Sequence, residues 1–171
     1  MRVFFSLRPS QVVQQALWEL QASLSQAAGR PVPAENFHMT LSFLGEVSGN
    51  VIDALIHRAE TVHHPQFQLR LDEIGFFARP AILFVGPSSS PQRLTSLART
   101  IRRLAYEAGV ASRNSKFVPH VTLYRQAKFT ATHLQPNILW RVTHFELTES
   151  ILSANGSRYQ TIAEFPLIPK K

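Results

Sequence analysis

The pattern of hydrophobic and polar positions predicts alternating strands and helices in the first third of the chain. The segment 2–7 contains the continuous apolar run of a buried strand. Ser10 is a candidate helix N-cap, and apolar residues then recur every three or four positions up to Leu24. A second strand is expected at 37–44 and a second helix at 51–63. The expected order is therefore strand, helix, strand, helix.

The rest of the chain repeats this alternation. An amphipathic helix is expected from Leu94 to just before Gly109, and its polar side carries several arginines. The dipeptide Asn155-Gly156 predicts a hairpin turn. Further strands are expected at 67–77, 81–85, 117–124, 142–152 and 159–167. Because strands and helices interleave in both halves, the sequence predicts an α/β protein of the α+β kind.

Composition narrows the classes of protein that this chain can belong to. It has 171 residues, 44% of them hydrophobic and 17% charged, a net charge of +7, and no cysteine. A disulfide scaffold, a thiolate metal site and a cysteine nucleophile are thereby excluded. From this length we expect one domain over residues 1–171, and we expect it to be a monomer. We expect a cytoplasmic location because no targeting or membrane segment is recognisable. The surplus of positive charge favours a polyanionic ligand.

One short motif occurs twice and is the strongest chemical signal in the sequence. The pattern His-x-Thr-Leu begins at His38 and again at His120, each time within a predicted strand. Because alternate side chains of a strand point to the same face, each copy displays its His beside its Thr and buries the residues between them. The matched flanks indicate an internal duplication, and two halves related by a pseudo-two-fold axis would bring both pairs to one shared cleft.

Two imidazoles at one cleft suit acid and base catalysis without a metal. With an ordinary pKa of about 6.5, one ring can be neutral and the other protonated near neutral pH. The hydroxyls of Thr40 and Thr122 can donate hydrogen bonds to phosphoryl oxygens. The spacing does not indicate which histidine is the acid. A single copy of the motif would be explained by an ordinary strand whose polar face is exposed to solvent.

The flanks of the motifs resemble a known family. The segments 2–5, 30–32, 36–45 and 119–123 resemble bacterial RNA 2′,3′-cyclic phosphodiesterases, historically called 2′-5′ RNA ligases, of the two-histidine phosphoesterase superfamily. The resemblance covers nearly the whole chain. It implies a bilobal, duplicated fold with antiparallel sheets around a central cleft and helices outside. It also implies hydrolysis of RNA 2′,3′-cyclic phosphates to 2′-phosphomonoesters, with no cofactor and no metal, and a reversible 2′-5′ ligation.

The resemblance also implies a role for each site residue. His38 matches the proton donor to the departing 3′ oxygen, and His120 matches the base that accepts a proton from water. Thr40 and Thr122 match the hydroxyls that hold the phosphate. Arg125 is expected to contact the substrate, although strict alternation would place it on the face opposite His120.

Other functions stay open at this stage. Tyr124 could stack on a base or pack in the core. His57, Glu60 and His64 share the spacing of one helix face, but histidines near a helix C-terminus are favoured without a metal. The alternatives to an RNA phosphodiesterase are a non-catalytic RNA-binding or nucleotide-binding module and a phosphodiesterase for another small cyclic nucleotide.

Overall fold

The computed structural model describes residues 1–27, 29–110, 116–129 and 132–169. Its α-helices are α1 (Gln11–Ser23), α2 (Gly49–Ala59) and α3 (Gln92–Glu107), and two short 3₁₀ turns are η1 (Ser25–Ala27) and η2 (Ala34–Asn36). The strands are β1 (Arg2–Leu7), β2 (Arg30–Pro31), β3 (Met39–Glu46), β4 (Phe67–Leu71), β5 (Glu73–Phe77), β6 (Ile82–Gly86), β7 (Val121–Arg125), β8 (Ile138–Val142), β9 (His144–Ser153) and β10 (Gly156–Pro166).

One antiparallel sheet forms the centre of the molecule. Its strand order is β10-β9-β1-β3-β7-β6-β5, with β2 added along β7, and β4 pairs with β8 in a separate ribbon. The two halves of the large sheet meet between β3 and β7, where Met39 pairs with Val121. The α+β class and the antiparallel arrangement expected from the sequence are therefore confirmed.

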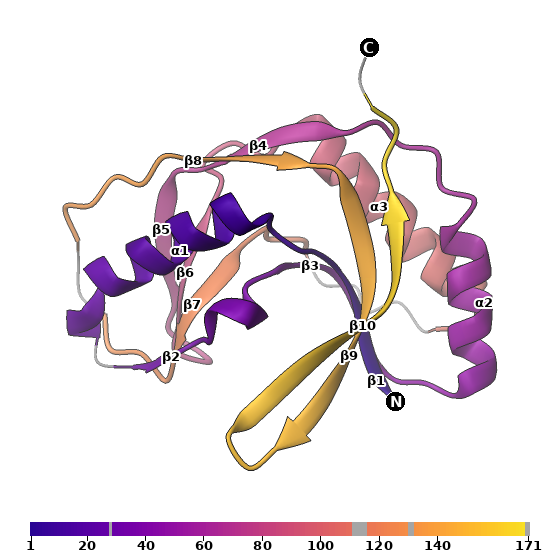
Figure 1. Cartoon of the computed structure of the whole chain (residues 1–171), viewed down its shortest axis with the longest axis horizontal. Helices are drawn as coiled ribbons and strands as arrows, with labels where there is room; N and C mark the ends of the chain where they lie inside the picture. Colours follow the sequence, from indigo (N-terminus) through magenta and orange to yellow (C-terminus); the bar gives the residue numbers. More distant parts are fainter. Residues whose placement is uncertain (28, 111–115, 130–131, 170–171) are drawn as a thin grey trace.

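The helices cover the outside of this sheet. In Figure 1, α1 lies on one side of the molecule and α2 and α3 lie on the other, while the β9–β10 hairpin projects away from the body. The hydroxyls of Ser10 and Ser48 cap α1 and α2 by accepting from backbone N–H groups. Within the described residues, no helix is both long and apolar enough to span a membrane.

Each copy of the repeated motif contains a β-bulge at its leucine. Thr40 and Ser42 pair with successive residues of β1, so Leu41 is an extra residue between them. The second copy repeats the arrangement, because the residues on either side of Leu123 pair with successive residues of β6. Both leucines are buried. The structure thus repeats in the two copies a backbone irregularity that the sequence alone does not reveal.

One predicted strand is wrong. The segment 67–77 is not a single strand, because the chain leaves the β4–β8 ribbon at Asp72 and enters the large sheet as β5. The Asp72 carboxylate accepts hydrogen bonds from the backbone N–H and the hydroxyl of Ser88, 2.7 and 2.8 Å away, which holds this break. Strand β8 was not predicted, although its buried and exposed residues alternate regularly.

A buried glutamine ties α1 to the bulge of the second motif. The Nε2 group of Gln21 donates to the carbonyl oxygens of Val32 and Leu123, both 2.8 Å away. The backbone carbonyl of Gln21 accepts a hydrogen bond from the Tyr124 hydroxyl at 2.7 Å. The segment after β2 and the bulged part of β7 are thereby held together by one side chain.

Replacing this glutamine should destabilise the fold. Gln21→Leu removes the donor from two buried carbonyl contacts, and we expect a loss of about 1–3 kcal/mol in the free energy of unfolding. Urea denaturation followed by circular dichroism measures this loss. Gln15→Leu on the exposed side of the same helix is the matched control, with an expected change below about 0.5 kcal/mol. Equal effects of both substitutions would contradict the role given to Gln21.

Candidate active site

The two motif copies lie on neighbouring strands at the centre of the sheet. Met39 and Val121 pair directly and are both fully buried on one face. Because side chains alternate, the residues on either side of this pair project to the opposite face. These residues are His38, Thr40, His120 and Thr122, and all four are half-buried. Two imidazoles and two hydroxyls therefore share one face of two adjacent strands.

His38 is held in one orientation by its neighbours. Its Nδ1 donates to the carbonyl oxygen of Asn36 at 2.7 Å, since a carbonyl can only accept. Its Nε2 lies 3.1 Å from the Thr40 hydroxyl. The rings of Phe4 and Tyr159 contact the imidazole, with centroids 4.9 and 5.0 Å away. Nε2 is consequently the atom that can exchange a proton with a ligand.

His120 repeats this arrangement on the second strand. Its Nδ1 donates to the carbonyl oxygen of Val118, again two residues earlier in the chain and again at 2.7 Å. The rings of Phe77 and Phe84 stand edge-on to the imidazole, at 5.3 and 5.4 Å. Each histidine thus uses Nδ1 for the backbone and keeps Nε2 for chemistry.

The environment makes both imidazoles weaker bases than the sequence suggested. Burial lowers the pKa of His38 to about 4, and the positive charge of Arg125 adds to this effect. Burial also lowers the pKa of His120, with Arg125 contributing again. The expectation of ordinary values near 6.5 is therefore wrong. Without an anion in the site, both rings are neutral at neutral pH.

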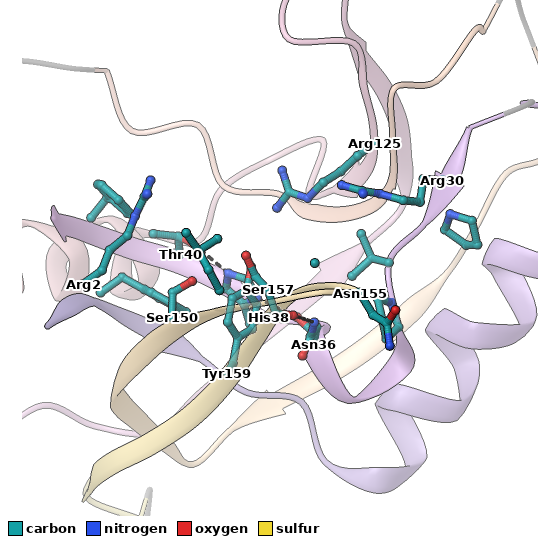
Figure 2. Close-up of a pocket in the computed structure, with 17 residues that line it drawn as sticks. Arg2, Arg30, Asn36, His38, Thr40, Arg125, Ser150, Asn155, Ser157 and Tyr159 are labelled. Atoms are coloured by element: carbon teal, nitrogen blue, oxygen red, sulfur yellow. Dashed lines mark hydrogen bonds between the residues drawn. The ribbon is translucent and has the colours of Figure 1, made fainter.

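A pocket of about 570 Å³ opens beside His38. It is bounded by β3, β7, the segment that contains β2, and the β9–β10 hairpin, and Figure 2 shows its polar lining. His120 and Thr122 do not line this pocket. The polar side chains around it come from Arg2, Arg30, Asn36, His38, Thr40, Arg125, Ser150, Asn155, Ser157 and Tyr159. Its described lining contains three arginines and no carboxylate, which suits an anionic ligand.

The bulge at Leu123 explains how Arg125 reaches this pocket. The extra residue shifts the alternation of β7, so that Leu123 and Tyr124 are both buried and Arg125 returns to the face of His120. The Tyr124 ring is packed in the core, with its hydroxyl bonded to the Gln21 carbonyl. Of the two roles considered for Tyr124, packing is the one that the structure supports.

Two glycines allow the backbone to approach closely around the site. A Cβ on Gly29 would lie 2.8 Å from the carbonyl oxygen of Arg125, and one on Gly86 would lie 2.7 Å from that of Pro119. Both distances are shorter than the contact distance between a carbon atom and a carbonyl oxygen, so a side chain at either position would clash with the backbone. Glycine is therefore required where β2 meets β7 and where β6 passes the residue before His120.

The metal-ligating side chains of the described residues gather away from this pocket. His144, Glu146 and Glu164 offer ligand atoms within 4.8 Å of one another, whereas His57, Glu60 and His64, which the sequence already disfavoured as a metal site, form no such group. Glu146 is already paired with Arg8 at 3.0 Å. Burial alone would raise the pKa of Glu146, but hydrogen bonds from His144 and Arg8 lower it below its usual value. The group is thus an ion-pair network.

Comparisons with known proteins agree with this geometry. The sequence profile described as LigT like Phosphoesterase matches residues 7–84. The chain is 34% identical to the RNA 2′,3′-cyclic phosphodiesterase of Escherichia coli, over 97% of this chain and 96% of that protein. It is 30% identical to the protein of the same name from Aquifex aeolicus, over 81% of this chain and 82% of that protein. The chain belongs to the LigT-like phosphoesterase family.

Solved structures of this LigT-like family share the complete fold. The apo form of E. coli LigT superposes with a TM-score of 0.89 at 33% identity, covering 98% of this chain and 97% of that one. Its complex with 3′-AMP gives 0.90 at 34% identity and 97% coverage of both chains. The bilobal fold implied by the sequence resemblance is confirmed.

Sequence reasoning missed two residues of this LigT-like site. Asn36 orients His38 through its backbone carbonyl, and its side-chain amide donates to the carbonyl oxygen of Ser157 on the β9–β10 hairpin at 3.0 Å. Tyr159 on the same hairpin contacts the His38 ring. A backbone carbonyl carries no residue-type signal, and the hairpin is far from the motif in sequence, so no local pattern could have identified either.

Removing the positive charge of Arg125 should strengthen His38 as a base. Arg125→Gln is expected to raise the pKa of His38 above about 4, because the arginine disfavours the imidazolium. Titration of the imidazole signals by NMR in the ligand-free protein measures the shift. Arg99→Gln, an exposed change on α3, is the control and should leave the pKa unchanged. An unchanged or lower pKa in Arg125→Gln would contradict this electrostatic coupling.

Proposed function

We propose that this chain hydrolyses RNA 2′,3′-cyclic phosphate ends to 2′-phosphomonoesters, with His38 as proton donor and His120 as proton acceptor. The observation that carries the proposal is the pair of imidazoles at the starts of the adjacent strands β3 and β7, each bound through Nδ1 to a carbonyl two residues earlier. Membership of the LigT-like family supports it, since relatives in bacteria are named RNA 2′,3′-cyclic phosphodiesterases.

The reaction needs one proton accepted and one donated. Nε2 of His120 takes a proton from water while the water oxygen bonds to phosphorus. The bond between phosphorus and the 3′ oxygen breaks, and Nε2–H of His38 gives its proton to that oxygen. The products are a 3′ hydroxyl and a 2′-phosphomonoester. If an RNA 5′ hydroxyl replaces water, the same steps form a 2′-5′ phosphodiester, and we include this reversible ligation in the proposal.

The pocket supports the assignment of His38 as the acid. Its volume of about 570 Å³ lies within the range of about 300–1,000 Å³ that holds small ligands. A nucleoside in this pocket would bring its 3′ oxygen to the side of His38. In-line attack then requires water to approach from the opposite side of phosphorus, which is where His120 would act.

Three further residues would hold the phosphate during this step. We assign Thr40 and Thr122 as donors to phosphoryl oxygens, because their hydroxyls share the face of the two imidazoles. Arg125 would contact the phosphate and offset the charge that develops on its oxygens. Thr40 lies within hydrogen-bond distance of His38, so a bound phosphate would compete for its hydroxyl.

The proposal includes no metal and no cofactor, because two imidazoles and an arginine supply the proton transfers and the charge. It treats residues 1–171 as one two-lobed domain whose substrate is an RNA or nucleotide with a cyclic end. A monomer suffices, since residues of one chain line the pocket. We assign the enzyme to the cytoplasm, as a place where RNA occurs.

Loss of either histidine should nearly abolish turnover of a nucleoside 2′,3′-cyclic phosphate. His38→Ala and His120→Ala are each expected to lower kcat by about a hundredfold or more, because general acid or base catalysis contributes about 10²–10⁴. The double variant should lose little beyond the worse single variant, since the two groups act together. Chromatography of the products in excess EDTA measures rate and product, and the 2′-phosphate is expected.

His57→Ala is the matched control for these variants, because His57 is exposed on α2. Its turnover should equal that of the unmodified protein, and circular dichroism should show that all variants fold. Near-normal turnover in either active-site variant would end the two-histidine mechanism. Loss of activity in EDTA that is restored by Zn²⁺ would instead indicate a metal enzyme.

The pH dependence should differ between kcat and kcat/KM. In the free enzyme the pKa of His38 is held at about 4, so its protonated form is scarce at neutral pH. A bound phosphate anion favours the imidazolium and raises this pKa. We therefore expect the alkaline limb of the kcat profile at higher pH than the alkaline limb of kcat/KM. Coincident limbs, with chemistry rate-limiting, would refute this effect of the substrate.

A further inference from the structure

The charge of the pocket exceeds what a cyclic phosphate can neutralise. Arg2, Arg30 and Arg125 line the pocket, and the described lining holds no carboxylate. None of the ion pairs found among the described residues involves these three arginines. A 2′,3′-cyclic phosphate carries a single negative charge. A ligand that matches this pocket therefore brings at least one more anionic group.

Arg30 and Arg125 form an unusual pair. They are direct partners in the antiparallel pairing of β2 with β7, and like charges placed opposite each other destabilise a sheet. In Figure 2, both side chains extend over the pocket from the same side, and Arg2 lies at the other end beyond Thr40. The arrangement becomes favourable when anions lie against the two guanidiniums.

The backbone holds Arg30 firmly in this position. The N–H of Val32 donates to the carbonyl oxygen of Leu123 at 2.9 Å, and Gln21 binds the carbonyl oxygen of Val32. Gly29 allows the chain to pass within contact distance of Arg125 and Ala127. These contacts restrict the main chain of β2 and so fix the position from which the Arg30 side chain extends.

The opposite wall of the pocket adds polar groups that can bind a sugar-phosphate chain. Asn155, Gly156 and Ser157 form the tip of the β9–β10 hairpin and line the pocket together with Arg30. The Asn36 amide donates to the carbonyl oxygen of Ser157 and so fastens the hairpin beside His38. The pocket is thus built by separate segments of the chain, and a hydrogen bond joins two of them beside His38.

We propose that Arg30, facing the tip of the β9–β10 hairpin, binds the phosphodiester that precedes the cyclic phosphate in an RNA strand, while Arg125 binds the cyclic phosphate itself. This inference rests on the proposed function, because it needs the cyclic end at the two histidines. It makes an oligonucleotide with a cyclic end a better substrate than a nucleoside 2′,3′-cyclic phosphate. The additional contact is electrostatic and independent of base identity.

Three substrates test this proposal. The first is uridine 2′,3′-cyclic phosphate, the second is a diuridine with a natural phosphodiester and a cyclic end, and the third is the same dinucleotide with a neutral methylphosphonate linkage. We expect kcat/KM for the natural dinucleotide to exceed that for the methylphosphonate about tenfold, the effect of one charge-assisted hydrogen bond. Raising the salt concentration should reduce this ratio.

Three variants locate the contact. Arg30→Gln should bring the ratio between the natural and methylphosphonate dinucleotides close to one. Arg2→Gln removes the same charge from the other end of the pocket and should keep the ratio, even if both rates fall. Arg99→Gln on the exposed side of α3 is the distant control and should change neither rate.

The outcomes separate this inference from the proposed function. If uridine 2′,3′-cyclic phosphate is not hydrolysed, the proposed function itself fails. If it is hydrolysed but the two dinucleotides react equally, or if Arg30→Gln lowers both rates equally, the site at Arg30 is refuted. An equal loss of the ratio in Arg2→Gln and Arg30→Gln also refutes it, since that result indicates general attraction to the whole pocket.

Discussion

The active site depends on one antiparallel contact, the pairing of Met39 with Val121. These residues join the two halves of the sheet, and both are fully buried. Because they fill the buried face, the residues on either side must point to the other face. The same packing that closes the core therefore brings the two imidazoles together. Any shift of this register by one residue would turn the histidines into the core and the apolar side chains into the cleft.

The alternation of residue types was sufficient to predict this part of the structure. Each motif places a polar side chain at every second position, and the structure places both His-Thr pairs on one face of adjacent strands. The shared cleft expected from the duplication stays a prediction, because His120 and Thr122 do not line the pocket beside His38. The position of Arg125 could not be derived in the same way, because strict alternation sends it to the wrong face. A bulge at Leu123 reverses the alternation, and its cause is tertiary: its carbonyl accepts hydrogen bonds from Gln21 and Val32. Neither partner is close in sequence.

The pKa values of the two histidines also could not be predicted from the sequence. An imidazole has an ordinary pKa until its surroundings are known, and the aromatic rings around His38 come from β1 and β10. The rings around His120 come from β5 and β6. Only the folded sheet assembles these walls, so the desolvation that lowers both pKa values is a property of the fold. The family resemblance supplied residue roles, but not the direction in which the pKa values of the two histidines are shifted.

Two features of the site are unfavourable by themselves, and an anionic ligand would relieve both. The guanidiniums of Arg30 and Arg125 oppose each other across a strand pair, and the buried imidazole of His38 resists protonation. An anion in the pocket reduces the repulsion between the guanidiniums of Arg30 and Arg125. The same anion favours the protonated form of His38. Protonation of His38, the proposed acid, would thereby be coupled to the binding of phosphate. Under the mechanism proposed above, both histidines stay neutral until the substrate binds. The negative charge of the substrate then favours protonation of His38, the proposed acid, while His120 stays neutral as the proposed base.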